Sequence, residues 1–189
     1  MNEIPENNIP KKKKKAKDSG DMFDWVQCLV PAMVVFLLLF VFVGRSLYVI
    51  GGSMEPTLVE GDRLVISRLF YTPERGDIVV LQKNSFSDTS IVKRVIATEG
   101  ETVDIDFEAG IVYVDGVALD EPYTNAPTNS QQDFDEPVTV PEGCVFVMGD
   151  NRNRSTDSRT DSIGCVDSRH IIGKAFFRLM PFDKFGKIE

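Results

Sequence analysis

The chain contains a single histidine, His170, among its 189 residues, and this limits the catalytic sites that it can form. A metal site with several histidine ligands is excluded, and a Ser/His/Asp triad would depend on that one residue. A lysine in apolar surroundings is another possible base, because burial lowers the pKa of its amine. Side chains that suit such chemistry lie in three short segments, residues 51–58, 91–96 and 148–159.

The segment 51–58 reads Gly-Gly-Ser-Met-Glu-Pro-Thr-Leu. Gly51 and Gly52 allow unusual backbone dihedrals before Ser53 and let another chain approach closely, while Pro56 fixes the turn that follows. Taken alone, the segment is either a plain turn or a loop that presents a reactive serine hydroxyl.

The segment 91–96 places two adjacent cations, Lys93 and Arg94, in an apolar strand. Successive side chains of a strand point to opposite faces, so one of the two cations must share an apolar face. The ordinary interpretation is a cation on the solvated face or one that reaches out from the sheet edge. The alternative is a buried lysine that loses its proton and acts as a base, which arginine cannot do. The pattern alone does not decide which face points inward.

The segment 148–159 concentrates glycine, amide, carboxylate, hydroxyl and guanidinium groups directly after an apolar strand. Neither the spacing of its acidic residues nor a closing glutamate fits a calcium loop, so we predict no metal site. We expect an ion pair between Asp157 and Arg159 that pins the loop, beside a serine hydroxyl that faces a site.

Short runs with period-two alternation, separated by turn residues, predict a mainly β domain after residue 45. Asp115-Gly116 is typical of a hairpin turn, and residues 120–137 predict a long exposed loop. The expected architecture is an antiparallel β sandwich or barrel. The predicted strands are Arg63–Ser67, Asp77–Gln82, Ile91–Thr98, Thr102–Phe107, Ile111–Val114, Cys144–Met148 and Lys174–Leu179.

Nineteen consecutive uncharged residues, Trp25–Val43, form the longest apolar run. At ~1.5 Å per residue they cover roughly the 30 Å hydrocarbon core of a membrane. A cleaved secretory signal is the alternative, but its apolar region usually has only about 7 to 15 residues and ends at small residues. This run ends at Gly44-Arg45, so we interpret it as a membrane anchor.

The net charge of −8 argues against a general nucleic-acid binder, and it is an average over two opposite parts. Residues 1–21 hold six lysines and carry +2, whereas residues 46–189 carry −10. The positive-inside bias therefore places the N-terminus in the cytoplasm. We predict a disordered basic cytoplasmic tail at 1–21, a single transmembrane signal-anchor helix at 22–45 and an extracytoplasmic domain at 46–189.

Three cysteines exclude a dense disulfide scaffold. Cys28 lies in the apolar run, whereas Cys144 and Cys165 lie in the outer part of the chain and flank the segment 148–159. A disulfide between Cys144 and Cys165 and two separate thiols are both open interpretations.

The order and spacing of these segments resemble the bacterial type I signal peptidases, membrane-bound serine proteases that remove signal peptides from exported proteins. The resemblance covers the anchor and five motifs in residues 53–58, 75–79, 93–96, 149–159 and 172–175. It implies that residues 46–189 are the catalytic domain, anchored in the cell membrane, with Ser53 as nucleophile and Lys93 as general base. It also implies a hydrogen bond from Ser155 to the lysine, and support of the site by Asp157 and Arg159. A Ser/Lys dyad needs no histidine, metal or cofactor.

The resemblance further implies that the substrate lies as an added strand between residues 51–53 and the edge at residues 90–93. Gly51 and Gly52 would contact it, and Met54 and Val92 would line pockets for small residues before the scissile bond. The backbone N–H of Ser53 would hold the oxyanion. Relatives with two membrane spans often have a serine at the position of Gly51, and its hydroxyl is a second hydrogen-bond donor to the oxyanion. In having glycine there, this chain resembles the smaller Gram-positive enzymes. Whether another group replaces that second donor is open. The implied partners are signal peptides, the phospholipid membrane and, transiently, the secretion translocon.

Two departures from the family pattern, Asn153-Arg154 and Ala97-Thr98-Glu99-Gly100, remove no catalytic group. Two other classes of function compete with the protease. One is a non-enzymatic membrane-tethered β module that binds export partners, which the joint presence of the serine, lysine and loop residues disfavours. The other is a self-cleaving repressor with a Ser/Lys dyad, which would require a DNA-binding domain.

Overall fold

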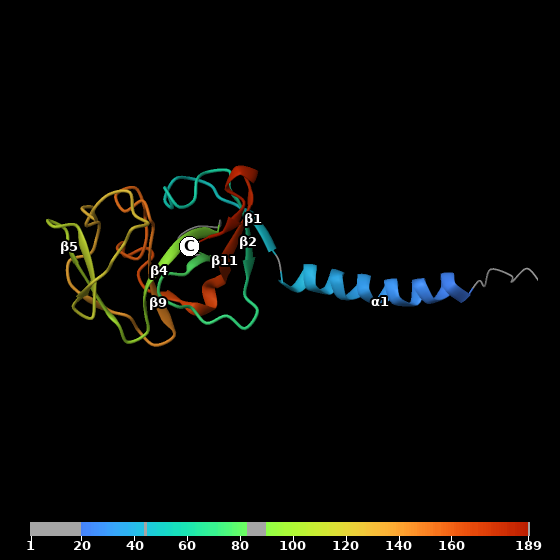
Figure 1. Ribbon diagram of the computed structural model, residues 1–189. Helices are drawn as coiled ribbons and strands as arrows, with labels where there is room; N and C mark the ends of the chain where they lie inside the picture. Colours follow the sequence, from blue (N-terminus) through green and yellow to red (C-terminus); the bar gives the residue numbers. More distant parts are fainter. Residues whose placement is uncertain (1–19, 44, 83–89, 189) are drawn as a thin grey trace, which may run out of the picture. The chain divides into compact units, whose positions relative to one another are not determined.

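The computed structural model describes residues 20–43, 45–82 and 90–188 of the chain (Figure 1). The chain divides into two compact units, Met1–Leu39 and Phe40–Glu189, and each is considered by itself. Most of the predicted disordered tail, residues 1–19, lies outside the described residues.

A single helix, α1, covers Gly20–Val43 and includes Pro31. The side chains described within it, such as Trp25 and Phe36, are exposed. Among the described residues, no helix meets the length and apolarity that a membrane span requires. A spanning role for residues 22–45 is therefore not shown.

The second unit is built on two antiparallel sheets, so the predicted mainly β, antiparallel fold is confirmed. The larger sheet has the order β1-β2-β11-β3-β4-β9-β10, with β12 paired to β11, and the smaller has the order β7-β6-β5-β8. The described pairings of the larger sheet form an open path that ends at β1 and β10 rather than a closed barrel. In Figure 1, β5 of the smaller sheet lies at one end of this unit, away from β2 and β11. The strands are β1 Arg45–Tyr48, β2 Arg63–Ser67, β3 Ile78–Leu81, β4 Ile91–Thr98, β5 Thr102–Asp106, β6 Ile111–Val114, β7 Val117–Ala118, β8 Val138–Thr139, β9 Cys144–Met148, β10 Val166–Asp167, β11 Ile171–Met180 and β12 Gly186–Lys187; short 3-10 helices cover Ser168–His170 and Phe182–Lys184.

All seven predicted strands are present, three of them with different ends. The longest change is at β11, which begins at Ile171 rather than Lys174. The hairpin at Asp115-Gly116 is confirmed, with both residues at the positive φ that its turn requires (52° and 77°). The sequence did not predict β1, β8, β10 and β12, because strands of two to four residues are too short to show alternation.

The core explains why β3 and β4 are buried on both faces. One apolar cluster lies under the turn that follows β1 and includes Met54, Leu58, Leu64 and Val80. A second joins the smaller sheet to β4 and β9, and a third covers the opposite side of β3 and β9. These clusters cover both faces of β3 and of most of β4, whose first two residues are only partly buried.

Residues 120–137 contain no helix or strand, as predicted, and ten of these eighteen residues are exposed. Thr128 and Phe134 are buried, and the Phe134 ring packs edge-on against Phe107 and Phe146. The loop is therefore exposed along much of its length and is attached to the domain by these buried side chains.

Candidate active site

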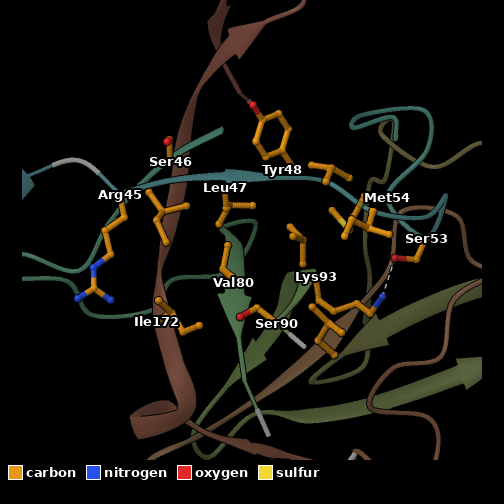
Figure 2. A pocket seen from close by; sticks show the side chains of 15 residues that line it. Arg45, Ser46, Leu47, Tyr48, Ser53, Met54, Val80, Ser90, Lys93 and Ile172 are labelled. Atoms are coloured by element: carbon orange, nitrogen blue, oxygen red, sulfur yellow. Dashed lines mark hydrogen bonds between the residues drawn. The ribbon is translucent and has the colours of Figure 1, made fainter. Parts of the chain in front are cut away.

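Ser53 and Lys93, forty residues apart in the chain, meet in the structure. Lys93 Nζ donates a hydrogen bond to Ser53 Oγ at 2.7 Å. Figure 2 shows the two side chains at one end of a cavity, Ser53 from the loop after β1 and Lys93 from strand β4. A neutral amine at this distance can accept the proton of the serine hydroxyl.

The turn that carries Ser53 is held from within by its own apolar side chains. Met54 and Leu58 are buried in the cluster beneath it, and the Leu58 N–H bonds the Met54 carbonyl at 2.9 Å. Gly51 has a φ of 81°, in the left-handed region that glycine adopts without strain. Ser53 therefore follows a glycine that adopts a left-handed conformation and precedes two buried apolar side chains that fix the turn.

Lys93 is buried, with only 3% of its surface exposed. Desolvation by burial lowers its pKa from the usual value of 10.5 to about 8. Smaller electrostatic effects oppose each other, because the Asp157 carboxylate raises this pKa and the Arg159 guanidinium lowers it. A substantial share of the amine is therefore neutral near physiological pH.

Arg94, on the opposite face of β4, is also 3% exposed, so the ordinary surface interpretation is wrong for both cations. Its Nε and Nη2 each donate a 2.8 Å hydrogen bond to the Asp150 carboxylate. Its guanidinium lies 3.9 Å from the centre of the Tyr123 ring. Thr57 Oγ1 donates to Asp150 as well, so this carboxylate links the serine turn to the lysine strand.

The loop after β9 contains the predicted ion pair, which is confirmed. Arg159 Nε donates to Asp157 Oδ1 at 2.8 Å, and both side chains are fully buried. Asp157 also accepts the Gly149 N–H at 3.0 Å, while Arg159 donates to the carbonyls of Ser130 and Arg152. The pair therefore ties both ends of the loop to the neighbouring segment 120–137.

A cavity of about 410 Å³ extends from Ser53 and Lys93 along the sheet (Figure 2). Its walls are mainly apolar, and in Figure 2 Leu47 and Val80 face each other across it. Gly51 and Gly52 are not among its lining residues. The lining consists of Arg45, Ser46, Leu47, Tyr48, Val49, Ile50, Ser53, Met54, Ile66, Val80, Ser90, Ile91, Val92, Lys93 and Ile172.

The strand edge beside this cavity is available for pairing. Strand β4 pairs with β9 through residues 94–98, and its first residues, Ile91 to Lys93, pair only with β3 in the described ladder. An extended peptide in the cavity would therefore meet backbone groups of β4 next to the Lys93 amine.

Comparison with known proteins matches residues 22–180 to one family model, "Signal peptidase, peptidase S26". A probable signal peptidase I-1 from Synechocystis is 41% identical over 86% of this chain and 85% of its own length. A signal peptidase I from Bacillus licheniformis is 35% identical over 93% of this chain and 98% of its own. The chain belongs to the type I signal peptidases of family S26. A crystal structure of a signal peptidase I from Enterococcus faecalis is 33% identical and covers 55% of this chain and 97% of its own, at a TM-score of 0.45.

As a type I signal peptidase the chain is a serine peptidase, a hydrolase of peptide bonds. One contact that the family resemblance implies is not formed. Ser155 is buried, but among the described residues its Oγ has no hydrogen-bond partner, so it does not bond Lys93. Its hydroxyl lies instead against Gly149, where an added Cβ would come within 2.3 Å of it.

Other residues singled out from the sequence are not among those that line the cavity. Cys144 is a free thiol, so the disulfide to Cys165 is not formed. His170 is exposed on the 3-10 helix Ser168–His170. Within the described part of the chain, no cluster of three His, Cys, Asp or Glu side chains could bind a metal ion.

The sequence missed several groups that hold the signal peptidase site. Asn151 bonds the Gly52 and Ser53 carbonyls, Arg178 bonds the Thr57 carbonyl, and Tyr123 covers Arg94. Asn151 lies inside a segment already noted for its polar density. Arg178 and Tyr123 lie in a strand and a loop with no comparable signal, so only the fold identifies them.

Proposed function

We propose that this signal peptidase cleaves signal peptides of exported preproteins with Ser53 as nucleophile and Lys93 as general base. The observation that carries the proposal is the 2.7 Å contact between Lys93 Nζ and Ser53 Oγ, with the lysine buried and its pKa lowered to about 8. A fully charged surface lysine would have no free pair of electrons for the serine proton.

The reaction follows the usual course of acyl transfer. Ser53 Oγ attacks the scissile carbonyl carbon while Lys93 Nζ takes the hydroxyl proton, and the carbonyl oxygen becomes an oxyanion. The backbone N–H of Ser53 donates to that oxyanion. The C–N bond then breaks, and the Lys93 ammonium returns the proton to the leaving amine. Water, deprotonated by Lys93, releases the acyl group from Ser53 in a second round of the same chemistry.

The substrate binds as an extended strand along the open edge at residues 90–93. Its backbone groups pair with β4, and alternate side chains enter the apolar cavity beside Met54 and Val92. Met54 and Val92 line the cavity next to Ser53 and Lys93, and their apolar side chains would contact small apolar residues before the scissile bond. Gly51 and Gly52 leave the approach to Ser53 without bulky side chains.

Asp157 and Arg159 support the dyad by fixing the loop and by opposing each other's effect on the Lys93 pKa. Ser155 contributes through its packing against Gly149. Every group needed for the reaction is supplied by side chains and backbone, so the proposed mechanism uses no cofactor.

Residues 22–45 anchor the enzyme in the cell membrane, with the basic tail in the cytoplasm and residues 46–189 on the outer face. This part of the proposal depends on the uncharged run Trp25–Val43 and on the six lysines before it. Preproteins would then reach the site as they leave the secretion translocon, with their signal peptides still in the lipid.

The test compares the wild type with Ser53→Ala and with Lys93→Met, which keeps the length of the side chain without its amine. We expect purified wild type to cleave a preprotein at one site after a small residue and both variants to lose this activity by at least about a thousandfold. His170→Gln is the matched control and keeps full activity. Cleavage that survives either dyad substitution rejects the mechanism.

A further inference from the structure

Asn151 holds the backbone on both sides of the Ser53 α-carbon. Its side-chain Nδ2 donates to the Gly52 carbonyl at 3.0 Å, and its backbone N–H donates to the Ser53 carbonyl at 3.0 Å. Asn151 itself is 4% exposed. Two consecutive carbonyls of the serine turn are thus bound by one buried residue of the loop after β9.

The bond to the Gly52 carbonyl fixes the direction of the Ser53 N–H. Glu55–Pro56 and Met180–Pro181 are the cis peptides of the described residues, so the Gly52–Ser53 peptide is trans. In a trans peptide the C=O and N–H point in opposite directions within one plane. Holding the Gly52 oxygen toward Asn151 therefore directs the Ser53 N–H away from this loop.

The residues around Asn151 make it a rigid support. Asp150, directly before it, is bonded by Arg94 and Thr57, and Arg152, directly after it, is bonded to Glu121 and Thr128. Within the described residues, the Gly52 carbonyl also accepts a hydrogen bond from Glu55 N at a longer 3.3 Å. Without the Asn151 amide, this longer turn contact would remain to orient the peptide.

We infer that Asn151 is a positioning residue for the oxyanion hole, acting through the Gly52–Ser53 peptide plane. The inference rests on the proposed function, in which the Ser53 N–H binds the oxyanion. Asn151 is not among the residues that line the cavity, and its bonds to the serine turn go to backbone carbonyls, so its contribution arises when charge develops on the carbonyl oxygen. Loss of its side-chain amide should therefore weaken binding of the transition state and leave binding of the ground state unchanged.

The experiment measures two inhibition constants of one peptide scaffold. A peptide aldehyde with the residues that precede the scissile bond adds Ser53 Oγ across its carbonyl and places an oxygen in the oxyanion position. The matching peptide alcohol has no carbonyl for Ser53 to attack. Reversible unfolding of a variant raises both apparent inhibition constants by the same factor, so the ratio of the two constants does not depend on the fraction of folded enzyme.

For Asn151→Leu and the smaller Asn151→Ala, we expect kcat to fall and the aldehyde inhibition constant to rise, each by about 10- to 100-fold, less than the loss of a whole donor. We expect KM and the alcohol inhibition constant to stay within about twofold of the wild-type values. The pH at which activity rises should be unchanged. Asn153→Ala is the matched control, because its amide bonds the backbone of residues 127–130 and not the serine turn.

Equal changes in the aldehyde and alcohol constants, or an unchanged kcat, would overturn the inference and leave the dyad intact. Cleavage by Ser53→Ala would instead overturn the nucleophile assignment and the inference with it. The two failures are therefore distinguishable.

Discussion

Arg159 and Asp157 form a fully buried ion pair at 2.8 Å, and the two charges act on Lys93 in opposite directions. Substituting Arg159 with Met leaves the Asp157 carboxylate unopposed, which raises the pKa of the Lys93 amine. We therefore expect the low-pH limb of kcat/KM to move to higher pH than in the wild type, with a loss of activity at pH 7. The measurement is kcat/KM as a function of pH.

The matched control is Arg154→Met, an exposed arginine of the same loop, whose pH profile should coincide with that of the wild type. Removing one partner of a buried pair also costs about 3–5 kcal/mol of stability, so the assay is run at low temperature. An unchanged limb in folded Arg159→Met would show that the ion pair has no electrostatic role at the lysine.

Arg178 holds the serine turn from the side of β11. It donates to the Thr57 carbonyl, and its Nε lies 3.1 Å from the buried carboxylate of Asp62. Arg178→Met should lower the free energy of unfolding by about 2–3 kcal/mol, because it leaves Asp62 buried without its cation. Activity should fall as well, since the turn loses an attachment.

Arg169→Met is the comparison for this prediction, because Arg169 forms an ion pair with Asp167 while 86% of its side chain is exposed. Surface pairs of this kind add little stability, so this variant should unfold close to the wild-type midpoint. Urea denaturation measures both variants, and equal midpoints for the two would contradict the role given to Arg178.

Gly149 leaves no room for a larger side chain, because its α-carbon lies against both the Ser53 carbonyl and the Ser155 side chain. A Cβ added there would come within 2.4 Å of the Ser53 carbonyl oxygen and 2.3 Å of Ser155 Oγ. Gly149→Ala must displace the Ser53 backbone, and we expect kcat/KM to fall by about 100-fold.

Adding Ser155→Ala to Gly149→Ala should restore only part of this activity, since the clash with the Ser53 carbonyl remains. Gly143→Ala separates this clash from backbone strain, because Gly143 has a φ of 71° and open space around it. It should lower stability by about 1–2 kcal/mol while keeping its activity. Wild-type kcat/KM in Gly149→Ala would refute the packing argument.

The strands could be predicted because they depend on local signals, whereas the pairing of Ser53 with Lys93 could be expected only from the family resemblance. Alternating apolar residues predicted every strand of four or more residues except β1. The β1 sequence Arg-Ser-Leu-Tyr does not alternate clearly between polar and apolar residues. Turn chemistry gave the hairpin at Asp115-Gly116. The strand pattern around Lys93 left two faces open, and the family resemblance rather than the pattern selected Lys93.

What the sequence could not give depends on contacts between distant segments. Apolar clusters cover both sides of the larger sheet at β4, so Lys93 and Arg94 are both desolvated although they point to opposite faces. The loop 120–137 has a polar composition, yet Phe134 packs into the core and Glu121 pairs with Arg152. For Ser155, the family motif predicted a hydrogen bond to Lys93 that is not formed. Its side chain packs against Gly149 instead.

The central claim is that the neutral amine of Lys93 is the base, and the pH dependence of kcat/KM for a signal-peptide substrate tests it most directly. Since desolvation lowers the pKa of Lys93 to about 8, the active form is lost as the pH falls below that value. We predict that kcat/KM rises about tenfold per pH unit below 8 and levels off above it, in wild type and in His170→Gln alike. A profile that is flat from pH 6 to 9, or a limb near 6.5 that disappears in His170→Gln, would contradict the account.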